Sequence, residues 1–268
     1  MKNDNFLTKP SLERIVCQAC TADQFHEDHY FRLAREIHQE PKFHRKQWEY
    51  IYILRALEQF DLLRPGITGL GFGCGKEPIA VVMAKNELNV VVTDIPPLDC
   101  SDSHWGSREA MDLFYGGICS EEKYKKHVSF RAVNMNDIPD DLGTYDFVWS
   151  CCALEHLGSL KHGIDFVLNS TKCLKPGGLA IHTTEFNISN NGDTLESQGL
   201  SLYRGRDFVE LQNQLIEAGC SFLPMNFYIG NLPEDKYIDL PPYKQDVHLK
   251  LMIDGFILTS FGVVLRKN

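Results

Sequence analysis

Apolar positions along the chain first follow a helical period and later occur in short runs typical of strands. In residues 44–63 the apolar side chains recur on one face at helical spacing, and Arg64-Pro65-Gly66 ends this pattern. The whole of residues 1–63 is predicted to be helical. The change of pattern therefore predicts an N-terminal helical cap, residues 1–63, followed by an α/β domain, residues 64–268.

Five runs in the second part have the length and composition of buried strands. Each is apolar or β-branched and is separated from the next by a helical pattern or by turn residues. The predicted strands are residues 67–72, 89–94, 128–133, 145–150 and 179–186, and predicted helices occupy residues 78–85 and 160–171. Such alternation predicts a doubly wound, Rossmann-like α/β fold with a mostly parallel sheet.

The C-terminal part has a different pattern. Residues 247–253 alternate between apolar and polar side chains, Asp254-Gly255 is a strong hairpin turn, and residues 256–267 form a second run. The sheet is therefore expected to end in an antiparallel hairpin.

Composition narrows the class of protein without changing the predicted fold. The chain has 268 residues, of which 43% are hydrophobic and 24% charged, and these are ordinary globular values. A net charge of −9 without a dense Lys/Arg run argues against nucleic-acid binding. No apolar stretch is long enough to span a membrane, the N-terminus lacks a signal-peptide core, and the nine scattered cysteines are typical of reduced thiols. We expect a cytoplasmic protein that neither binds nucleic acid nor inserts into a membrane.

One local group of metal-ligand residue types lies near the N-terminus. It consists of Cys17, Cys20, His26 and His29. The spacing between cysteines and histidines is too short for a classical zinc finger. We therefore expect thiols and imidazoles on a helical segment, and no metal.

A glycine-rich segment between the first predicted strand and its helix carries the strongest chemical signal. Gly71, Gly73 and Gly75 have the spacing G-x-G-x-G. A dinucleotide fingerprint requires G-x-G-x-x-G, and a P-loop requires Ser or Thr after Gly-Lys, whereas Glu77 follows Lys76 here. Both of those nucleotide-binding motifs are excluded. Glycines at a helix N-terminus still allow a ligand to approach the backbone closely.

The glycine segment resembles the first motif of class I S-adenosylmethionine-dependent methyltransferases. Further features follow in the order of that family over about residues 66–190. They are Asp94 at the end of the second predicted strand, Asn134-Met135 before Ile138-Pro139, Tyr145-Asp146-Phe147-Val148-Trp149-Ser150, and Leu174-Lys175-Pro176-Gly177-Gly178.

The resemblance implies that S-adenosylmethionine is the cofactor. It assigns the ribose hydroxyls to Asp94, the adenine to Asn134 and Met135, and a backbone approach to Cys151. The full set of implied cofactor contacts is Gly71, Phe72, Gly73, Gly75, Asp94, Ile95, Asn134, Met135 and Cys151.

The chain departs from the family at one position. The family usually has Asp or Glu two residues before the first glycine of the loop, where this chain has Gly69. That acid helps to hold the methionine part of the cofactor. Glu77 is the nearest replacement, although a carboxylate there can instead stabilise the N-terminus of the following helix.

Two residues are candidates for the reaction itself. His156 follows the fourth predicted strand, where plant phenolic O-methyltransferases have a similarly placed histidine that acts as base; the alternative is a histidine that orients a loop. Glu185 ends the fifth predicted strand and is expected to bind an acceptor hydroxyl or, alternatively, to face solvent. Strand alternation places Glu185 and Thr183 on one face and His182 and Thr184 on the other.

Other segments are expected to surround the acceptor. Insertions near residues 98–127, 187–203 and 222–246 are assigned to its pocket. Trp48, Glu49 and Tyr52 of the helix at 44–63 are interpreted either as an aromatic lid or, with more weight, as core residues.

Taken together, these features predict in-line methyl transfer to a small polar acceptor, with His156 as general base. A hydroxyl oxygen of a sugar, or of another precursor of surface polysaccharides or secondary metabolites, is favoured, because RKQWEYIYILRALE and LEHLG look similar to bacterial methyltransferases of such pathways. N-methylation is one alternative, and a non-catalytic cofactor-binding partner or sensor, suggested by Gly69, is another. Pro241-Pro242-Tyr243 lies too late in the chain to serve as a nucleic-acid methyltransferase motif.

Overall fold

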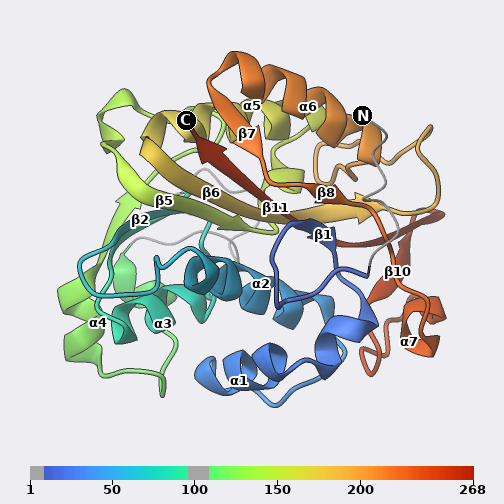
Figure 1. The fold of residues 1–268 in the computed structure, drawn as a ribbon, viewed down its shortest axis with the longest axis horizontal. Coiled ribbons are helices and arrows are strands. Elements are labelled where there is room, and N and C mark those ends of the chain that lie inside the picture. The colour runs from blue at the N-terminus through green and yellow to red at the C-terminus, as the bar shows by residue number, and fades with distance from the viewer. Residues whose placement is uncertain (1–8, 96–108) are drawn as a thin grey trace.

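The computed structural model of the protein describes residues 9–95 and 109–268 and is built around one twisted sheet. The strand order is β4-β3-β2-β5-β6-β11-β1-β8, and Figure 1 shows this sheet between two layers of helices. The first five strands in this order are all parallel. They are β4 (Val128–Ala132), β3 (Asn89–Asp94), β2 (Thr68–Phe72), β5 (Tyr145–Cys151) and β6 (Leu174–Asn187).

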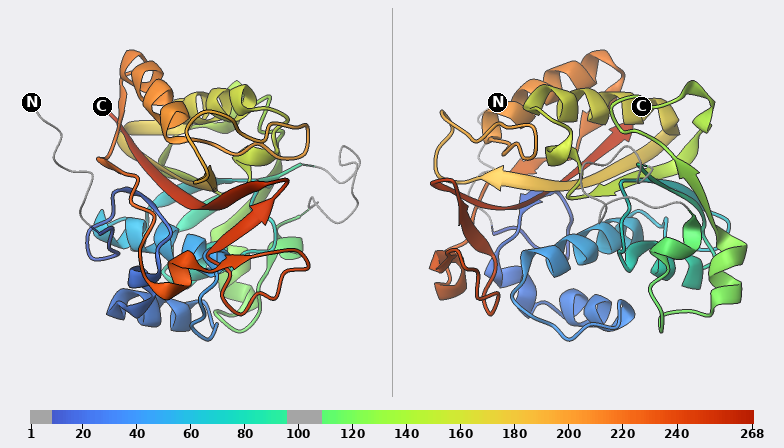
Figure 2. Two further views of the ribbon diagram at one scale, coloured as in Figure 1. Left: turned by 90° about the vertical axis from the view of Figure 1, so that its right-hand side faces the viewer. Right: turned by 180° about the vertical axis from the view of Figure 1, so that it is seen from behind.

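The helices cover both faces of the sheet, as the views in Figure 2 also show. One face is covered by α1 (Asp28–Glu36), α2 (Arg45–Gln59), α3 (Ile79–Lys85) and α4 (Glu121–His127), and the other by α5 (Leu160–Ser170) and α6 (Gly205–Glu217). The predicted doubly wound α/β fold is therefore confirmed. Among the described residues, no helix is long and apolar enough to cross a membrane.

The C-terminal hairpin is confirmed and extends the sheet. β10 (Lys250–Ile253) and β11 (Phe256–Lys267) are antiparallel, and β11 runs antiparallel along β6 from Leu258 to Arg266. The outer edge of β11 pairs in turn with β10, β1 (Cys17–Ala19) and β7 (Cys220–Phe222). Short elements β8 (Met225–Asn226), α7 (Pro233–Lys236) and β9 (Ile238–Asp239) complete this side.

The prediction that residues 1–63 are wholly helical is wrong at β1. Gln18 lies opposite Gly262 of β11, so the N-terminal segment contributes a strand to the sheet as well as helices to one face. Residues 17–19 are fully buried. A three-residue strand is too short to show a period of two, and its pairing depends on a strand more than 230 residues later.

The three predicted insertions differ in what the structure describes. Residues 98–108 lie outside the described residues, and the rest of the first insertion contains α4. Residues 187–203 form a loop with an antiparallel bridge between Glu196 and Ser201. The third insertion contains the short elements β8, α7 and β9.

Candidate active site

The turn after β2 is a tight glycine loop. Gly73 and Gly75 have φ angles of +59° and +47°, which other residues rarely adopt. A Cβ on Gly73 would lie 2.9 Å from Cβ of Ala153 and 3.1 Å from Sδ of Met135. The loop is fixed by the backbone N–H of Cys74, which donates to the carbonyl of Thr93 at 3.0 Å. Conformation and space therefore both require glycine at position 73.

Asp94 and Ile95 lie at the same edge of the sheet as this loop. β3 ends at Asp94 and runs parallel to β2, so the two carboxyl ends are adjacent. Asp94 is 8% exposed, and its Oδ1 accepts a hydrogen bond from the N–H of Ile95 at 2.8 Å. This edge is where doubly wound folds bind ligands.

The remaining predicted cofactor contacts have different surroundings. Phe72 is buried and its ring packs edge-on against Phe166 of α5, so only its backbone is available to a ligand. Met135 is buried beside Gly73, whereas Asn134 is exposed and its Oδ1 accepts from the N–H of Asn136 at 2.9 Å. Cys151 ends β5 on the same edge.

Aromatic rings of β5 explain why β2 has glycine where the family has an acid. Gly69 lies opposite Phe147 and Gly71 opposite Trp149. A Cβ on Gly69 would lie 2.3 Å from Cζ of Phe147, and a Cβ on Gly71 would lie 2.3 Å from Cζ2 of Trp149. The ring of Phe147 thus occupies the space that an Asp or Glu side chain at position 69 would need.

Glu77, directly before α3, supplies a carboxylate whose side chain is 11% exposed. Its Oε1 lies 3.9 Å from Nζ of Lys46, and its buried Oε2 has no hydrogen-bond partner among the described residues. Burial raises the pKa of Glu77 to about 8, although Lys46 opposes this shift. Lys46 Nζ also donates to the carbonyl of Cys151 at 3.4 Å, which links Glu77 to the end of β5.

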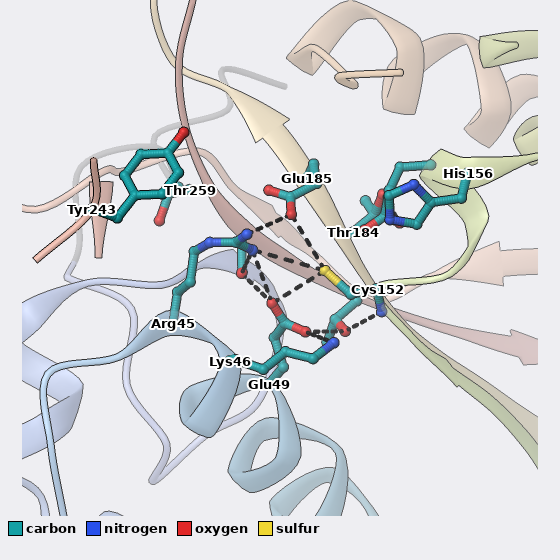
Figure 3. A network of polar contacts seen from close by, with 12 residues as sticks. Arg45, Lys46, Glu49, Cys152, His156, Thr184, Glu185, Tyr243 and Thr259 are labelled. Carbon is teal, nitrogen blue, oxygen red and sulfur yellow. Dashed lines mark hydrogen bonds and ion pairs between the residues drawn. The ribbon is translucent and has the colours of Figure 1, made fainter. Parts of the chain in front are cut away.

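A second polar group joins the N-terminus of α2 to the ends of β5 and β6, as Figure 3 shows. Arg45 Nη2 lies 2.6 Å from Oε1 of Glu185, and Arg45 Nη1 lies 3.3 Å from Oε1 of Glu49. The thiol of Cys152 donates to Oε1 of Glu49 at 3.3 Å and to Oε1 of Glu185 at 3.5 Å. Ser260 of β11 also donates to Glu49.

Two carboxylates of this group are shifted in opposite directions. Burial disfavours the charged form of Glu49, but Lys46 and Arg45 outweigh it and hold the pKa of Glu49 below its usual range. For Glu185, burial prevails over the attraction of Arg45 and raises the pKa. The negative charge of Glu49 is therefore well compensated by the neighbouring cations, whereas that of Glu185 is compensated only in part.

The predicted alternation along β6 is confirmed. His182 contacts Ser150 Oγ at 2.8 Å and Thr184 donates to Oε2 of Glu155 at 3.0 Å. Thr183 and Glu185 instead contact Glu49 and Arg45 of α2, on the other face. Glu185 is 5% exposed, so the solvent-facing alternative is wrong.

His156 lies at the end of the short helical turn Leu154–His156 and is exposed. Its Nδ1 lies 2.7 Å from the carbonyl of Gly199 in the 187–203 loop. Because a carbonyl only accepts, Nδ1 carries the proton in this contact, and the neutral ring has its lone pair on Nε2. In Figure 3, His156 is drawn beside Thr184, away from Arg45.

Sequence reasoning missed Arg45 and Lys46. Both are cations in the first turn of α2, where the helix dipole is unfavourable to positive charge and where no acid is present. Two cations at this unfavourable position could have been recognised from the sequence. Trp48 and Tyr52, by contrast, are fully buried and stack at 4.9 Å, which supports the interpretation as core residues.

The N-terminal cysteines and histidines do not form a ligand cluster. Cys17 belongs to β1, where its thiol donates to the carbonyl of Val264 at 3.4 Å, and His29 contacts Glu13 at 2.9 Å. Across the described parts of the chain, three side chains able to bind a metal converge only at Cys152, Glu155 and Glu185.

The chain has a doubly wound α/β fold, a class of protein in which ligands bind at the carboxyl ends of the parallel strands. Residues 43–221, more than half of the chain, match the model of a family described as a methyltransferase domain, and the chain belongs to that family. No curated protein sequence matches the chain.

Solved structures share the fold at low sequence identity. A proposed sarcosine dimethylglycine methyltransferase from Galdieria sulphuraria is 15% identical with a TM-score of 0.51, covering 83% of this chain and 84% of that one. The magnesium protoporphyrin IX methyltransferase of Synechocystis PCC 6803, solved with bound S-adenosylhomocysteine, is 12% identical with a TM-score of 0.50, covering 91% and 97%. A proposed methyltransferase from Bacillus halodurans C-125 is 15% identical with a TM-score of 0.50, covering 80% and 98%.

Membership of this family makes the protein an S-adenosylmethionine-dependent methyltransferase, with S-adenosylmethionine as its cofactor. The predicted family and enzyme class are confirmed.

Proposed function

We propose that the enzyme methylates a hydroxyl oxygen of a small polar acceptor, such as a sugar or another precursor of a surface polysaccharide or secondary metabolite. The observation that carries this proposal is the buried polar group at the ends of β5 and β6, next to the glycine loop. Lys46 connects the two regions, since its Nζ lies 3.4 Å from the Cys151 carbonyl and 3.2 Å from Oε2 of Glu49.

The cofactor is proposed to lie across the ends of β2 and β3. Asp94 would accept from the ribose hydroxyls, the Gly71–Gly75 loop would pass against the methionine part, and Met135 would pack on the adenine. Glu77, buried with an unpartnered oxygen, is a suitable carboxylate for the ammonium group of the methionine part. A buried acid of raised pKa is what a site prepared for a cationic ligand requires.

The acceptor is proposed to bind between Glu185 and the 187–203 loop. Bound S-adenosylmethionine would supply the methyl group, which would pass to the hydroxyl oxygen of the acceptor by in-line displacement with S-adenosylhomocysteine as the leaving group. His156 would take the hydroxyl proton through Nε2, since its Nδ1 faces the Gly199 carbonyl at 2.7 Å. Alignment of oxygen, carbon and sulfur supplies the rest of the rate enhancement.

One specific observation favours N-methylation as a second candidate. Glu155 and Glu185 each have a buried oxygen without a partner among the described residues. An amine acceptor would be attracted to such a site. The two candidates differ in the atom that carries the new methyl group.

A panel experiment tests the proposal. The protein is incubated with methyl-labelled S-adenosylmethionine and monosaccharides, amino sugars, sugar nucleotides and hydroxylated aromatics. Products are identified by mass spectrometry and by the NMR shift of the new methyl group. An O-methyl product supports the proposal, and an N-methyl product supports the second candidate. Tight S-adenosylhomocysteine binding without consumption of S-adenosylmethionine by any acceptor favours the sensor alternative.

A further inference from the structure

We propose that three side chains, Asp239, His248 and His44, position the first turn of α2 against the ends of β5 and β6. That turn carries Arg45 and Lys46. We call the three side chains the positioning row. Their importance for methyl transfer rests on the proposed function, in which the carboxylates that face these two cations bind the cofactor and the acceptor.

The first turn of α2 needs an anchor from outside the helix. Its backbone N–H groups have no partners within the helix, and the helix dipole opposes two cations at this end. The side chains of Arg45 and Lys46 are nevertheless only 13% and 34% exposed. Arg45 Nη2 lies 2.6 Å from Glu185, and Lys46 Nζ lies 3.2 Å from Glu49. A small displacement of the turn would disturb both contacts.

His44 satisfies one of these N–H groups as the N-cap residue of α2. Its Nδ1 accepts a hydrogen bond from the backbone N–H of Lys46 at 3.2 Å. The ring must be neutral for this, because a protonated Nδ1 has no lone pair. Burial, and to a smaller extent nearby cationic groups, lowers the pKa of His44 to about 4, so the ring is neutral at pH 7. His44 is therefore able to cap the helix.

His248 contacts this end of α2 with both its backbone and its ring. Its carbonyl accepts from the N–H of Arg45 at 3.0 Å, and its N–H donates to the carbonyl of Phe43 at 2.7 Å. Its ring lies against that of His44, with the centroids 4.7 Å apart. The ring of Tyr243 packs edge-on against His248 at 5.5 Å. His248 thus connects α2 to the segment that precedes β10.

Asp239 fixes the ring of His248 and closes the loop between them. It ends β9, which pairs with β10, and is 1% exposed. Nδ1 of His248 donates to its Oδ2 at 2.7 Å. The same carboxylate accepts from the backbone N–H groups of Lys244 at 3.0 Å and Gln245 at 3.1 Å. Three donors therefore satisfy the buried carboxylate and hold the imidazole in one orientation.

The thiol of Cys152 reports the position of the first turn of α2. Its Sγ lies 3.8 Å from Nη1 of Arg45 and donates to Glu49 at 3.3 Å, as Figure 3 shows. Both of these partners belong to α2. A displaced turn would uncover the thiol, which then reacts faster with an alkylating reagent.

Alkylation of the whole protein, without cofactor or acceptor, tests the positioning row. The reduced protein is treated with iodoacetamide, and tandem mass spectrometry measures the labelling rates of Cys152 and of the buried Cys17 in β1. We expect His44→Ala and Asp239→Asn to label at Cys152 about five-fold faster than wild type or more, through the loss of a helix cap or of a charged hydrogen bond. Cys17 should keep its slow rate, because the sheet stays folded.

Two variants separate positioning from general stability. His44→Asn provides a helix cap again, since asparagine is a preferred N-cap residue, and should return the labelling of Cys152 toward the wild-type rate. Asp146→Asn is the matched control. Asp146 also accepts a backbone N–H, that of Thr68 at 2.8 Å, but it lies near the opposite end of β5. This variant should label at Cys152 like wild type, and circular dichroism shows whether each variant is folded.

The positioning row is overturned if folded His44→Ala or Asp239→Asn labels at Cys152 like wild type, or if Cys17 becomes faster in parallel. It is also overturned if His44→Asn labels as fast as His44→Ala. With an acceptor from the panel, Asp239→Asn should raise the KM by about five-fold or more at nearly unchanged kcat, because Glu185 is proposed to bind the acceptor. Faster labelling with an unchanged KM, or with no acceptor methylated, supports the positioning row and contradicts the proposed function.

Discussion

The two proposed sides of the active site, one for the cofactor and one for the acceptor, are constructed differently. On the cofactor side, a continuous loop of glycines joins β2 to α3, and its backbone fits one conformation, with φ of +59° at Gly73. On the acceptor side, side chains from α2, from the end of β5 and from β6 meet although Arg45 and Glu185 are far apart in sequence. The first region depends on backbone geometry, and the second depends on charge compensation in a buried space. Substitutions should therefore affect the two regions in different ways.

Gly73→Val should have the largest effect on the cofactor side. The new side chain would collide with Ala153, and the positive φ would be strained. We expect calorimetry to detect no binding of S-adenosylhomocysteine. Gly66→Val is the matched control, because Gly66 has φ of +84° but open space around its Cβ position. If folded Gly73→Val binds as well as Gly66→Val, the cofactor does not lie against this loop.

His156→Ala tests the acceptor side and should have the next largest effect. Loss of a general base should lower turnover of the identified acceptor by about 10²–10⁴-fold, with almost unchanged binding of S-adenosylhomocysteine. His156→Gln keeps a polar side chain that can contact the Gly199 carbonyl but cannot act as base. Recovery of turnover in His156→Gln would show that His156 orients the loop. A rate within about five-fold of wild type in both variants would show that His156 is not the general base.

Glu77→Gln should have a smaller effect that depends on pH. Glu77 has a pKa of about 8, so binding of an ammonium group to its carboxylate should release a proton at pH 7. We expect the variant to bind S-adenosylhomocysteine about ten-fold more weakly, through the loss of one charged hydrogen bond. Calorimetry in buffers of different ionisation enthalpy should detect proton release in wild type and not in the variant.

Glu77→Gln is expected to weaken cofactor binding but to increase the stability of the folded protein at high pH. The folded pKa of Glu77 is raised from 4.5 to about 8, so its protonated form is favoured in the folded protein. Its contribution to stability is complete below pH 4.5 and is lost as the pH rises through 8. The melting temperature of Glu77→Gln relative to wild type should therefore increase by about 2–4 °C or more between pH 6 and pH 9. An unchanged difference would show that Glu77 is not destabilised by burial.

The cofactor side was largely predictable from the sequence because its signals are local. The glycine spacing, Asp94 at a strand end and the strand–helix alternation are contiguous patterns, and the structure has the strands within a few residues of the predicted bounds. The strand β1 was not predictable, because three buried residues show no period and are fixed only by β11.

The acceptor side was predictable only in part. Glu185 and His156 were found by their positions after strands, but their environments depend on long-range packing. Arg45 and Lys46 could be recognised as cations at the unfavourable end of a helix dipole. Two of their partners, Glu185 of β6 and the carbonyl of Cys151 in β5, lie more than 100 residues away. The ring of Phe147 over Gly69 likewise follows from strand register, which no local pattern specifies.

Calorimetry of S-adenosylhomocysteine binding to Asp94→Ala and Glu185→Gln, side by side, tests most directly whether the two sides are separate. Asp94 is proposed to bind the ribose through charge-assisted hydrogen bonds, so its loss should weaken binding by about 10–100-fold. Glu185 is proposed to act on the acceptor, so Glu185→Gln should bind within about two-fold of wild type. Full-strength binding by folded Asp94→Ala, or a large loss in Glu185→Gln, would contradict the assignment of the two sides.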